Sequence, residues 1–366
     1  MTVIDRIETI PFRIPLTSPV AFATGLLEAA EHVLVRVTDS DGAVGVAEAI
    51  PRPMIYGETV GTTMAVYEEE IRPRFLKRSI WDRERFLHEL ELLVANNTAK
   101  TAFELALHDL TAKHLGVSCH RLLGGYTDQV AVTAVLGYGS PEEVAVQALA
   151  EAERHGIASF KLKVGNDLAR DVATVRRVRE ALPGALVYVD ANHGYDALDA
   201  LRFGRMVAEL DLAWIEEPCP AERVLDRERV AAAGTLNVLA DESVPTAAAV
   251  ASEVLGRRAH MVSMKVARTG YAGGDLVRGF CELAGVPIVI GSQGDSGIGT
   301  LTSLAYGAAH RATSRYPGEY GYFLELADDL LASPLRIRDG RLAVRDVPGN
   351  GVEIDEDKLA HYRTDT

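Results

Sequence analysis

Short β-rich runs alternate with helical segments from residue 130 onward, and this alternation limits the possible folds more than any other feature. The runs lie at 130–136, 159–164, 186–190, 213–217, 238–242, 261–266 and 287–291. The segments between them have helical periodicity; in 167–182, for example, apolar residues recur at spacings of three and four. Alternation of this kind predicts parallel strands joined by crossover helices.

A polar residue ends five successive runs at nearly constant intervals. These residues are Lys163, Asp190, Glu216, Asp241 and Lys265, at successive spacings of 27, 26, 25 and 24 residues. Each interval fits one βα unit, and seven or eight units fill the chain to about residue 331, which suits a (β/α) barrel. An open dinucleotide-binding sheet is disfavoured because no G-x-G-x-x-G motif follows an early strand.

The first 120 residues or so have a different pattern. Residues 33–38 alternate in polarity and are followed by Asp39-Ser40-Asp41-Gly42, a sequence typical of a hairpin turn. From about residue 59 to residue 115 the period becomes helical. We therefore expect a small N-terminal α+β domain built on an antiparallel sheet.

Composition excludes several classes of protein. The net charge is −14, and no basic run is present, which argues against binding to nucleic acid or to an anionic membrane. No stretch of 18 apolar residues and no signal-like N-terminus occur. The three cysteines, at positions 119, 219 and 281, show no C-x-x-C spacing and are expected to be inert core thiols. We expect a cytoplasmic enzyme, and an anionic substrate would need a local cation to attract it.

Three of the predicted strands end in carboxylates. Asp190, Glu216 and Asp241 follow three adjacent strands, and the carboxyl ends of parallel barrel strands meet at one face. A single polar strand end is explained by entry into a loop, but three ionised carboxylates cannot sit together without a cation. Oxygen ligands favour Mg²⁺, with Mn²⁺ as a substitute, over zinc. The sequence predicts a divalent metal site.

Lysines lie on both sides of these carboxylates. Lys161 and Lys163 are two residues apart in one strand, so both side chains point into the barrel mouth, and Lys265 ends the sixth strand. A lysine placed among other cations has a lowered pKa, which suits proton abstraction from carbon. We therefore predict acid/base lysines on two sides of a metal-bound substrate.

The lysine pair, the carboxylate series and Lys265-Val266-Ala267-Arg268-Thr269-Gly270 resemble the enolase superfamily, within its muconate-lactonising branch. The resemblance covers nearly the whole chain. It implies an α/β fold of the (β/α)7β modified TIM-barrel type with an N-terminal capping domain. It also implies a carboxylate substrate whose enolate is stabilised by the metal, the mechanism known for this superfamily.

The resemblance implies roles for individual residues. Lys163 and Lys265 would be the acid/base groups on opposite faces of the substrate, with Lys161 as an extra cation near its carboxylate. Glu242 would support Lys265 from behind. Further substrate-binding candidates are Asn192, Asp295, Tyr56 and Phe22.

By resemblance, residues 1–125 form the capping domain, 126–331 the barrel, and 332–366 a segment that returns to the capping domain. Loops near 18–27 and 51–59 would act as lids that set specificity; both could instead be structural turns. Where cycloisomerases usually have glutamate before the glycine-rich turn, this chain has Asp295.

The branch contains several reactions, and muconate cycloisomerase is favoured. The stretches 297–303 and 319–331 resemble that family, whereas dipeptide epimerases usually carry two aspartates where this chain has Leu324-Glu325-Leu326. The expected partner is a small dicarboxylate, and homo-oligomers from dimer to octamer are expected. Alternatives are a dipeptide epimerase, an N-acylamino acid racemase, an o-succinylbenzoate synthase or, more remotely, a non-catalytic barrel.

Overall fold

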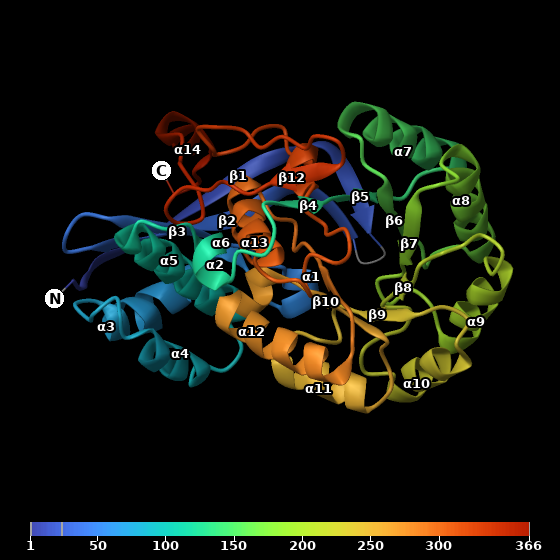
Figure 1. Ribbon diagram of the computed structural model, residues 1–366, viewed down its shortest axis with the longest axis horizontal. Helices are drawn as coiled ribbons and strands as arrows, with labels where there is room; N and C mark the ends of the chain where they lie inside the picture. The colour runs from blue at the N-terminus through green and yellow to red at the C-terminus, as the bar shows by residue number, and fades with distance from the viewer. Residues whose placement is uncertain (1, 23–24, 366) are drawn as a thin grey trace.

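The computed structural model describes the backbone of residues 2–22 and 25–365, and side chains except those of residues 19–26. The N-terminal part is a three-stranded antiparallel sheet followed by helices (Figure 1). The elements are β1 (Ile4–Phe22), β2 (Gly25–Asp39), β3 (Val44–Ala49), α1 (Pro53–Tyr56), α2 (Val60–Val66), the π-helical η1 (Tyr67–Ile71), α3 (Arg72–Phe75), α4 (Arg83–Glu91), α5 (Asn97–Leu115) and α6 (Cys119–Leu123).

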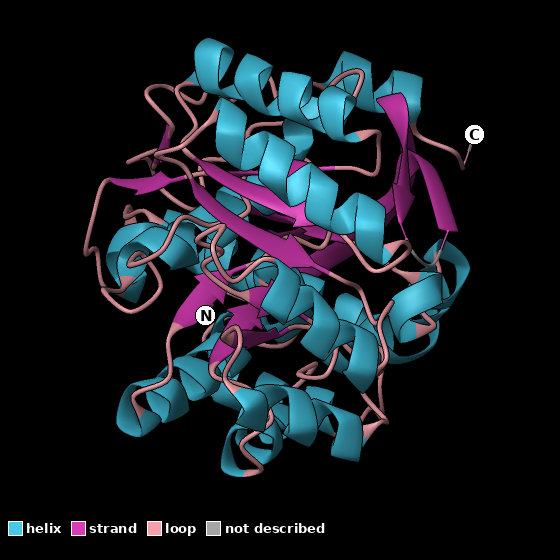
Figure 2. Ribbon diagram, turned by 90° about the vertical axis from the view of Figure 1, so that its right-hand side faces the viewer, coloured by secondary structure: helices cyan, strands magenta, loops and turns pink. Residues whose placement is uncertain are grey.

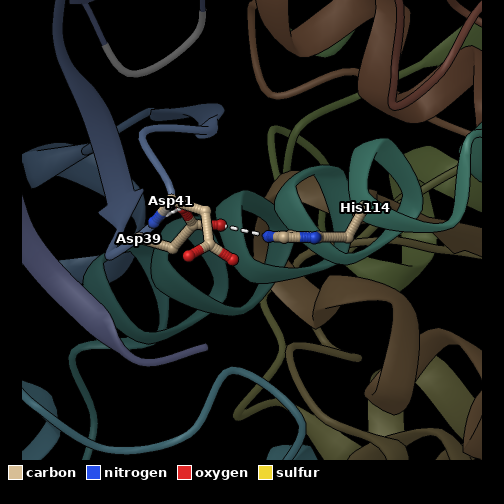
Figure 3. Close-up of side chains that lie close together, drawn as sticks. All are labelled: Asp39, Asp41 and His114. Atoms are coloured by element: carbon tan, nitrogen blue, oxygen red, sulfur yellow. Dashed lines mark hydrogen bonds and ion pairs between the residues drawn. The ribbon is translucent and has the colours of Figure 1, made fainter. Parts of the chain in front are cut away.

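The turn between β2 and β3 forms as its sequence predicts. The Asp39 carboxylate accepts hydrogen bonds from the backbone N–H groups of Asp41 and Ala43, and Gly42 has a positive φ of 87°. Figure 3 shows His114 of α5 reaching this turn, where its ring is hydrogen-bonded to Asp39. These contacts attach the turn to α5, and Asp39, Asp41 and His114 have a structural role here.

Helix α5 is the core of the N-terminal domain. It is buried along most of its length and packs directly on β3. The contact is close because Gly45 faces Ala106: a Cβ atom on Gly45 would lie 2.0 Å from the Ala106 carbonyl oxygen. Glycine at position 45 therefore sets the distance between sheet and helix.

The rest of the chain forms a curled parallel sheet with helices outside it (Figure 2). Seven parallel strands pair in chain order, from β5 to β11. These strands are β5 (Thr133–Leu136), β6 (Ser159–Lys163), β7 (Leu186–Asp190), β8 (Ile215–Glu216), β9 (Val238–Ala240), β10 (Met261–Met264) and β11 (Ile288–Ile290). Each lies within one of the seven predicted runs, which confirms the predicted fold class.

The eighth position of the barrel is filled by residues 318–320, which belong to no regular strand. The Glu319 N–H donates to the Ile290 carbonyl of β11, and the Thr133 N–H of β5 donates to the Gly318 carbonyl. The segment thus joins the last strand to the first and closes the barrel. A short 3₁₀ helix, η2 (Tyr322–Glu325), follows it.

Most of the barrel helices begin at a side chain that caps them. Ser140 and Glu143 form a capping box at the start of one helix, and Asp167 accepts two backbone N–H bonds at the start of the next. The helices are α7 (Pro141–His155), α8 (Leu168–Ala181), α9 (Ala197–Met206), α10 (Val224–Ala233), α11 (Ala247–Leu255), α12 (Val266–Ala284) and α13 (Gly297–Ala309). Of these, α10 and α12 have no such cap.

The C-terminal segment contacts both parts of the molecule. Strand β12 (Arg341–Ala343) pairs with β4 (Gln129–Ala131) beside the barrel, and α14 (Glu356–Tyr362) packs on β1. The Thr364 N–H donates to the Pro11 carbonyl. The β1–β2 hairpin reaches the barrel through Ala327, whose N–H donates to the Pro15 carbonyl.

The three cysteines are free and buried, as predicted. Among the described helices, none is long and apolar enough to cross a membrane.

We predict that Gly45→Ala lowers stability by about 1–3 kcal/mol, because the added methyl group must displace the Ala106 backbone. The matched control is Gly184→Ala, where a Cβ atom would meet nothing within 4 Å. Urea unfolding of both variants measures the difference. Equal stability of the two variants would contradict the close packing of β3 on α5.

Candidate active site

A cavity of about 660 Å³ lies at the carboxyl ends of the barrel strands. Its lining comes from both domains. The barrel provides the lysines and carboxylates, and the N-terminal domain provides Ser18, Leu27 and residues 52–56, including all of α1. Both predicted lid loops therefore contribute residues to the cavity wall.

The three carboxylates predicted as metal ligands are buried together at the ends of adjacent strands. Asp190 ends β7 and is paired in register with Glu216, which ends β8, and Asp241 directly follows β9. All three are at most 1% exposed. The parallel register places these groups side by side.

Lys161 joins three acidic side chains. Its Nζ atom donates to Glu216 Oε1 and Glu319 Oε1, both at 2.9 Å, and lies 2.9 Å from Asp190 Oδ2. An ammonium group has three N–H bonds, so these contacts use all of them. We infer that Lys161 acts here as a fixed positive charge.

Lys163 lies on the same side of β6, nearer the mouth. Its Nζ atom donates to Asp190 Oδ2 at 2.8 Å and to Asn192 Oδ1 at 2.7 Å. Both lysines therefore contact Asp190, as their spacing of two residues predicts. Asn192 lines the cavity and also donates from Nδ2 to Glu242 Oε1 at 2.9 Å.

Lys265 approaches from the sixth strand position, opposite the second position that carries Lys163 in a barrel of eight. Its Nζ atom donates to Asp241 Oδ2 at 2.5 Å. Arg268, one turn further into α12, donates to Asp241 Oδ1 and to the Tyr56 hydroxyl. Tyr56 thus lines the cavity and connects α1 of the N-terminal domain to the barrel.

The carboxylates titrate differently because their neighbours differ. Burial raises the pKa of Glu216 well above its ordinary value, in spite of Lys161. Burial opposes ionisation of Asp190 as well, but Lys161 and Lys163 hold its pKa below the usual range. Burial similarly opposes ionisation of Asp241, and Lys265 and Arg268 lower its pKa to about 2.

The predicted lowering of a lysine pKa is not observed in this arrangement. Burial alone would lower the pKa of Lys265, but Asp241, Tyr56 and Glu242 together raise it above its ordinary value. The pKa of Lys161 is also raised in spite of its burial, because carboxylates face its ammonium group. A lowered lysine pKa requires cationic neighbours, whereas these lysines face anions. A divalent cation on the same oxygens would act to lower the lysine pKa values.

The donor set fits a divalent cation. Glu216 Oε2 is buried and has no hydrogen-bond partner among the described residues. With Asp190 and Asp241, it offers oxygen ligands only, which Mg²⁺ and Mn²⁺ prefer. Asp190, Glu216 and Asp241 are therefore the residues that would hold the ion.

Glu242 lines the cavity beside Asn192 and His193. Burial and the neighbouring Asp241 and Asp190 raise the pKa of Glu242 to about 7. One oxygen each of Glu242 and Glu217 and a ring nitrogen of His193 lie within 4.8 Å of one another. Glu242 is hydrogen-bonded to Asn192, which also contacts Lys163, and its charge contributes to the raised pKa of Lys265.

Of the predicted substrate-binding residues, one does not line the cavity and another lies outside the described side chains. Asp295 does not line it, because its carboxylate is buried between the Gln293 N–H and the Ser303 hydroxyl. Phe22 lies among residues 19–26, whose side chains are outside the described part of the structure.

Glu319 is a site residue that the strand pattern missed. It is buried, accepts hydrogen bonds from Lys161 and from the Tyr188 hydroxyl, and lines the cavity. Its segment is too short and too polar to be recognised as a strand. The strand spacing therefore did not indicate it.

A buried ion pair holds the turn that carries Asp241. Glu217 Oε1 accepts hydrogen bonds from the backbone N–H groups of Asp241 and Ser243, and Arg227 donates to Glu217 Oε2 at 2.5 Å. Glu217 has a positive φ of 34°, a strained conformation that these bonds maintain. Glu217 thereby positions Asp241.

Comparison with known proteins agrees with this geometry. Residues 6–124 match the model of the mandelate racemase/muconate lactonizing enzyme N-terminal domain, and residues 143–358 match the enolase C-terminal domain-like model. The chain belongs to the enolase superfamily, in its muconate-lactonising branch. Members of this superfamily use a divalent metal, typically Mg²⁺.

Relatives within the superfamily include different enzymes. Muconate cycloisomerase 1 of Rhodococcus opacus is 33% identical over 365 residues, covering 97% of each chain. L-Ala-D/L-Glu epimerase of Bacillus subtilis is 29% identical over 358 residues, covering 95% of this chain and 96% of the relative. The structure of muconate lactonizing enzyme from M. smegmatis complexed with muconolactone is 45% identical, with a TM-score of 0.97 and coverage of 99% and 100%.

The pH dependence of stability tests the burial of Asp295. Burial and the nearby Glu48 raise the pKa of Asp295 to about 7, well above the ordinary value for an aspartate. The folded state therefore binds this proton more tightly than the unfolded state, and the group's contribution to stability falls as pH rises from about 4 to about 7.

We predict that Asp295→Asn stabilises the protein at pH 8 by on the order of 2–4 kcal/mol and flattens the decline in stability between about pH 4 and pH 7. Thermal unfolding measured from pH 4 to pH 8 tests both expectations. The control is Asp339→Asn, at an exposed turn. If the stability of Asp295→Asn falls with pH as steeply as that of the unmodified protein, the raised pKa of Asp295 is contradicted.

Proposed function

We propose that the protein is a muconate cycloisomerase, which converts cis,cis-muconate to muconolactone. The observation that carries the proposal is the similarity along the whole chain to the M. smegmatis enzyme complexed with muconolactone. The lysines on two sides of a carboxylate group are consistent with this reaction. We further propose a cytoplasmic homo-oligomer that uses Mg²⁺ or Mn²⁺.

In the proposed reaction, one carboxylate oxygen of muconate adds to a double bond and forms the lactone C–O bond. The carbon next to the other carboxylate then receives a proton. A divalent ion held by Asp190, Glu216 and Asp241 would supply positive charge to that carboxylate and favour charge build-up on it. Lys163 or Lys265 donates the proton and regains one from solvent.

The positions of the two lysines bear on whether the carboxylate and the proton add to the double bond on the same face (syn) or on opposite faces (anti). They come from the second and sixth of eight barrel positions, so they approach a substrate in the mouth from opposite sides. Lys161 holds its charge near the carboxylates and is fully hydrogen-bonded. The lysine that delivers the proton therefore decides between syn and anti addition.

A racemase or epimerase of the same branch is the second candidate function. Glu325 of η2 and Glu151 of α7 both line the cavity, and burial together with Glu151 raises the pKa of Glu325. Two neighbouring carboxylates suit a substrate ammonium group. In an epimerase, one lysine would remove the α-proton and the other would return a proton to the opposite face.

The deciding experiment follows the ultraviolet absorbance of cis,cis-muconate at neutral pH with Mg²⁺ or Mn²⁺, and again with EDTA. Metal-dependent loss with formation of muconolactone is expected. No loss with either metal would refute the cycloisomerase. Deuterium incorporation from D₂O at the α-carbon of dipeptides or N-acylamino acids, without ring closure, would instead support the epimerase.

Removing either acid/base lysine tests the chemistry. Lys163→Ala and Lys265→Ala should each lower kcat by about 10²- to 10⁴-fold or more, because the substrate loses a proton donor or a group that orients it. Lys77→Ala, at an exposed side chain, is the control. Circular dichroism checks that all three variants fold. Full activity in both cavity variants would exclude lysine acid/base chemistry.

A further inference from the structure

We propose that Arg52 and Tyr322 form a subsite for a second carboxylate of the substrate, across the barrel mouth from the metal-binding carboxylates. This inference rests on the proposed function and extends it, because it assigns the residues that select a dicarboxylate. Three features support the subsite: the charge balance of the cavity, the way Arg52 is held, and the Tyr322 hydroxyl beside it.

The cavity is rich in acidic groups, and its lysines already contact carboxylates. Lys161 and Lys163 contact Asp190, and Lys265 contacts Asp241. Arg52 also lines the cavity, yet within the described part of the chain no carboxylate oxygen forms an ion pair with its guanidinium. In a chain with a net charge of −14, Arg52 is the cation best able to attract an anionic group.

Arg52 is held in place by two reciprocal hydrogen bonds between the domains. Its Nε atom donates to the Gln293 carbonyl at 2.6 Å, and the Gln293 side-chain Nε2 donates to the Ile50 carbonyl at 2.6 Å. The first bond orients the guanidinium through Nε and leaves its two terminal nitrogens for a ligand. These can bind both oxygens of one carboxylate.

Gly294 makes room for the guanidinium. A Cβ atom at this position would lie 1.7 Å from an Arg52 terminal nitrogen, and Gly294 has a positive φ of 86°. The nearest buried acids are engaged elsewhere: Glu48 accepts from the Ser296 hydroxyl, and Asp295 accepts from Ser303. The loop after β11 therefore holds Arg52 without neutralising it.

Tyr322 adds a second donor. It lies in η2 beside Arg52 and lines the same cavity, and its buried hydroxyl faces the Arg52 guanidinium. Among the described residues no group accepts the hydroxyl proton, and a ligand carboxylate would accept it. Arg52 and Tyr322 together offer an anion three hydrogen-bond donor atoms.

The subsite faces the metal-binding carboxylates across the barrel. Gln293 follows the seventh strand and Tyr322 follows the eighth position, whereas Asp190, Glu216 and Asp241 end the third, fourth and fifth strands. A substrate with carboxylates at its two ends can therefore place one at each side. A monocarboxylate can use only one of them.

The test uses calorimetry to measure how tightly adipate and hexanoate bind to the whole protein in the presence of Mg²⁺. The two probes have the same chain length but differ in the second carboxylate. We expect tighter binding of adipate. Arg52→Gln should weaken adipate binding by about 10- to 100-fold and leave hexanoate binding unchanged, and Tyr322→Phe should have a smaller effect in the same direction. Arg85→Gln, at an exposed side chain, is the control.

Several results would overturn the subsite: equal binding of the two probes by the unmodified protein, equal losses for both probes in Arg52→Gln, or no loss for adipate. Muconate turnover separates this proposal from the proposed function. Turnover with an unchanged KM in Arg52→Gln refutes only the subsite. Absence of turnover together with the expected adipate pattern refutes only the cycloisomerase.

Discussion

The site depends on the compensation of negative charge on the buried carboxylates by positive charge on the lysines among them. Parallel register brings Asp190 and Glu216 side by side, and the next strand adds Asp241. Such a group of anions would repel itself in a space that excludes water, so its stability depends on cations in contact with it. Lys161 contributes most to this balance because it touches acidic groups from the third, fourth and eighth barrel positions.

Much of the barrel site could be predicted because strand ends have fixed consequences. A side chain at the carboxyl end of a parallel strand must face the mouth, so the positions of Lys163, Asp190, Glu216, Asp241 and Lys265 followed from the spacing alone. Glu319 and Arg268 could not be predicted in this way, since one lies in an irregular segment and the other in a helix. The lysine pKa values depend on which charges are nearest, and that requires three-dimensional contacts. Asp295 turned inward for the same reason: its hydrogen-bond partners, Gln293 and Ser303, were not evident from the sequence.

The two domains divide the work of the site. The barrel strands carry the lysines and carboxylates, while the N-terminal domain and the loops it contacts complete the cavity wall. Tyr56 and Arg52 reach the barrel from this domain and are hydrogen-bonded to Arg268 and Gln293. Relatives of similar identity include both a cycloisomerase and an epimerase. Under the proposed function, the strand ends transfer protons and the surrounding loops set which substrate is bound.

Closure of the barrel by residues 318–320 links activity to the order in which the chain is made. Lys161 is synthesised long before its partner Glu319. Strand β5 also lacks its pairing partner until residues 318–320 have been made. Until then, the edge of β5 is open and a buried ammonium group lacks one of its acceptors. Contacts so distant in sequence form slowly. A chain that already contains every proposed acid/base and metal-binding residue therefore still lacks Glu319 and the segment that closes the barrel, so the geometry of the site depends on residues made well after Lys265.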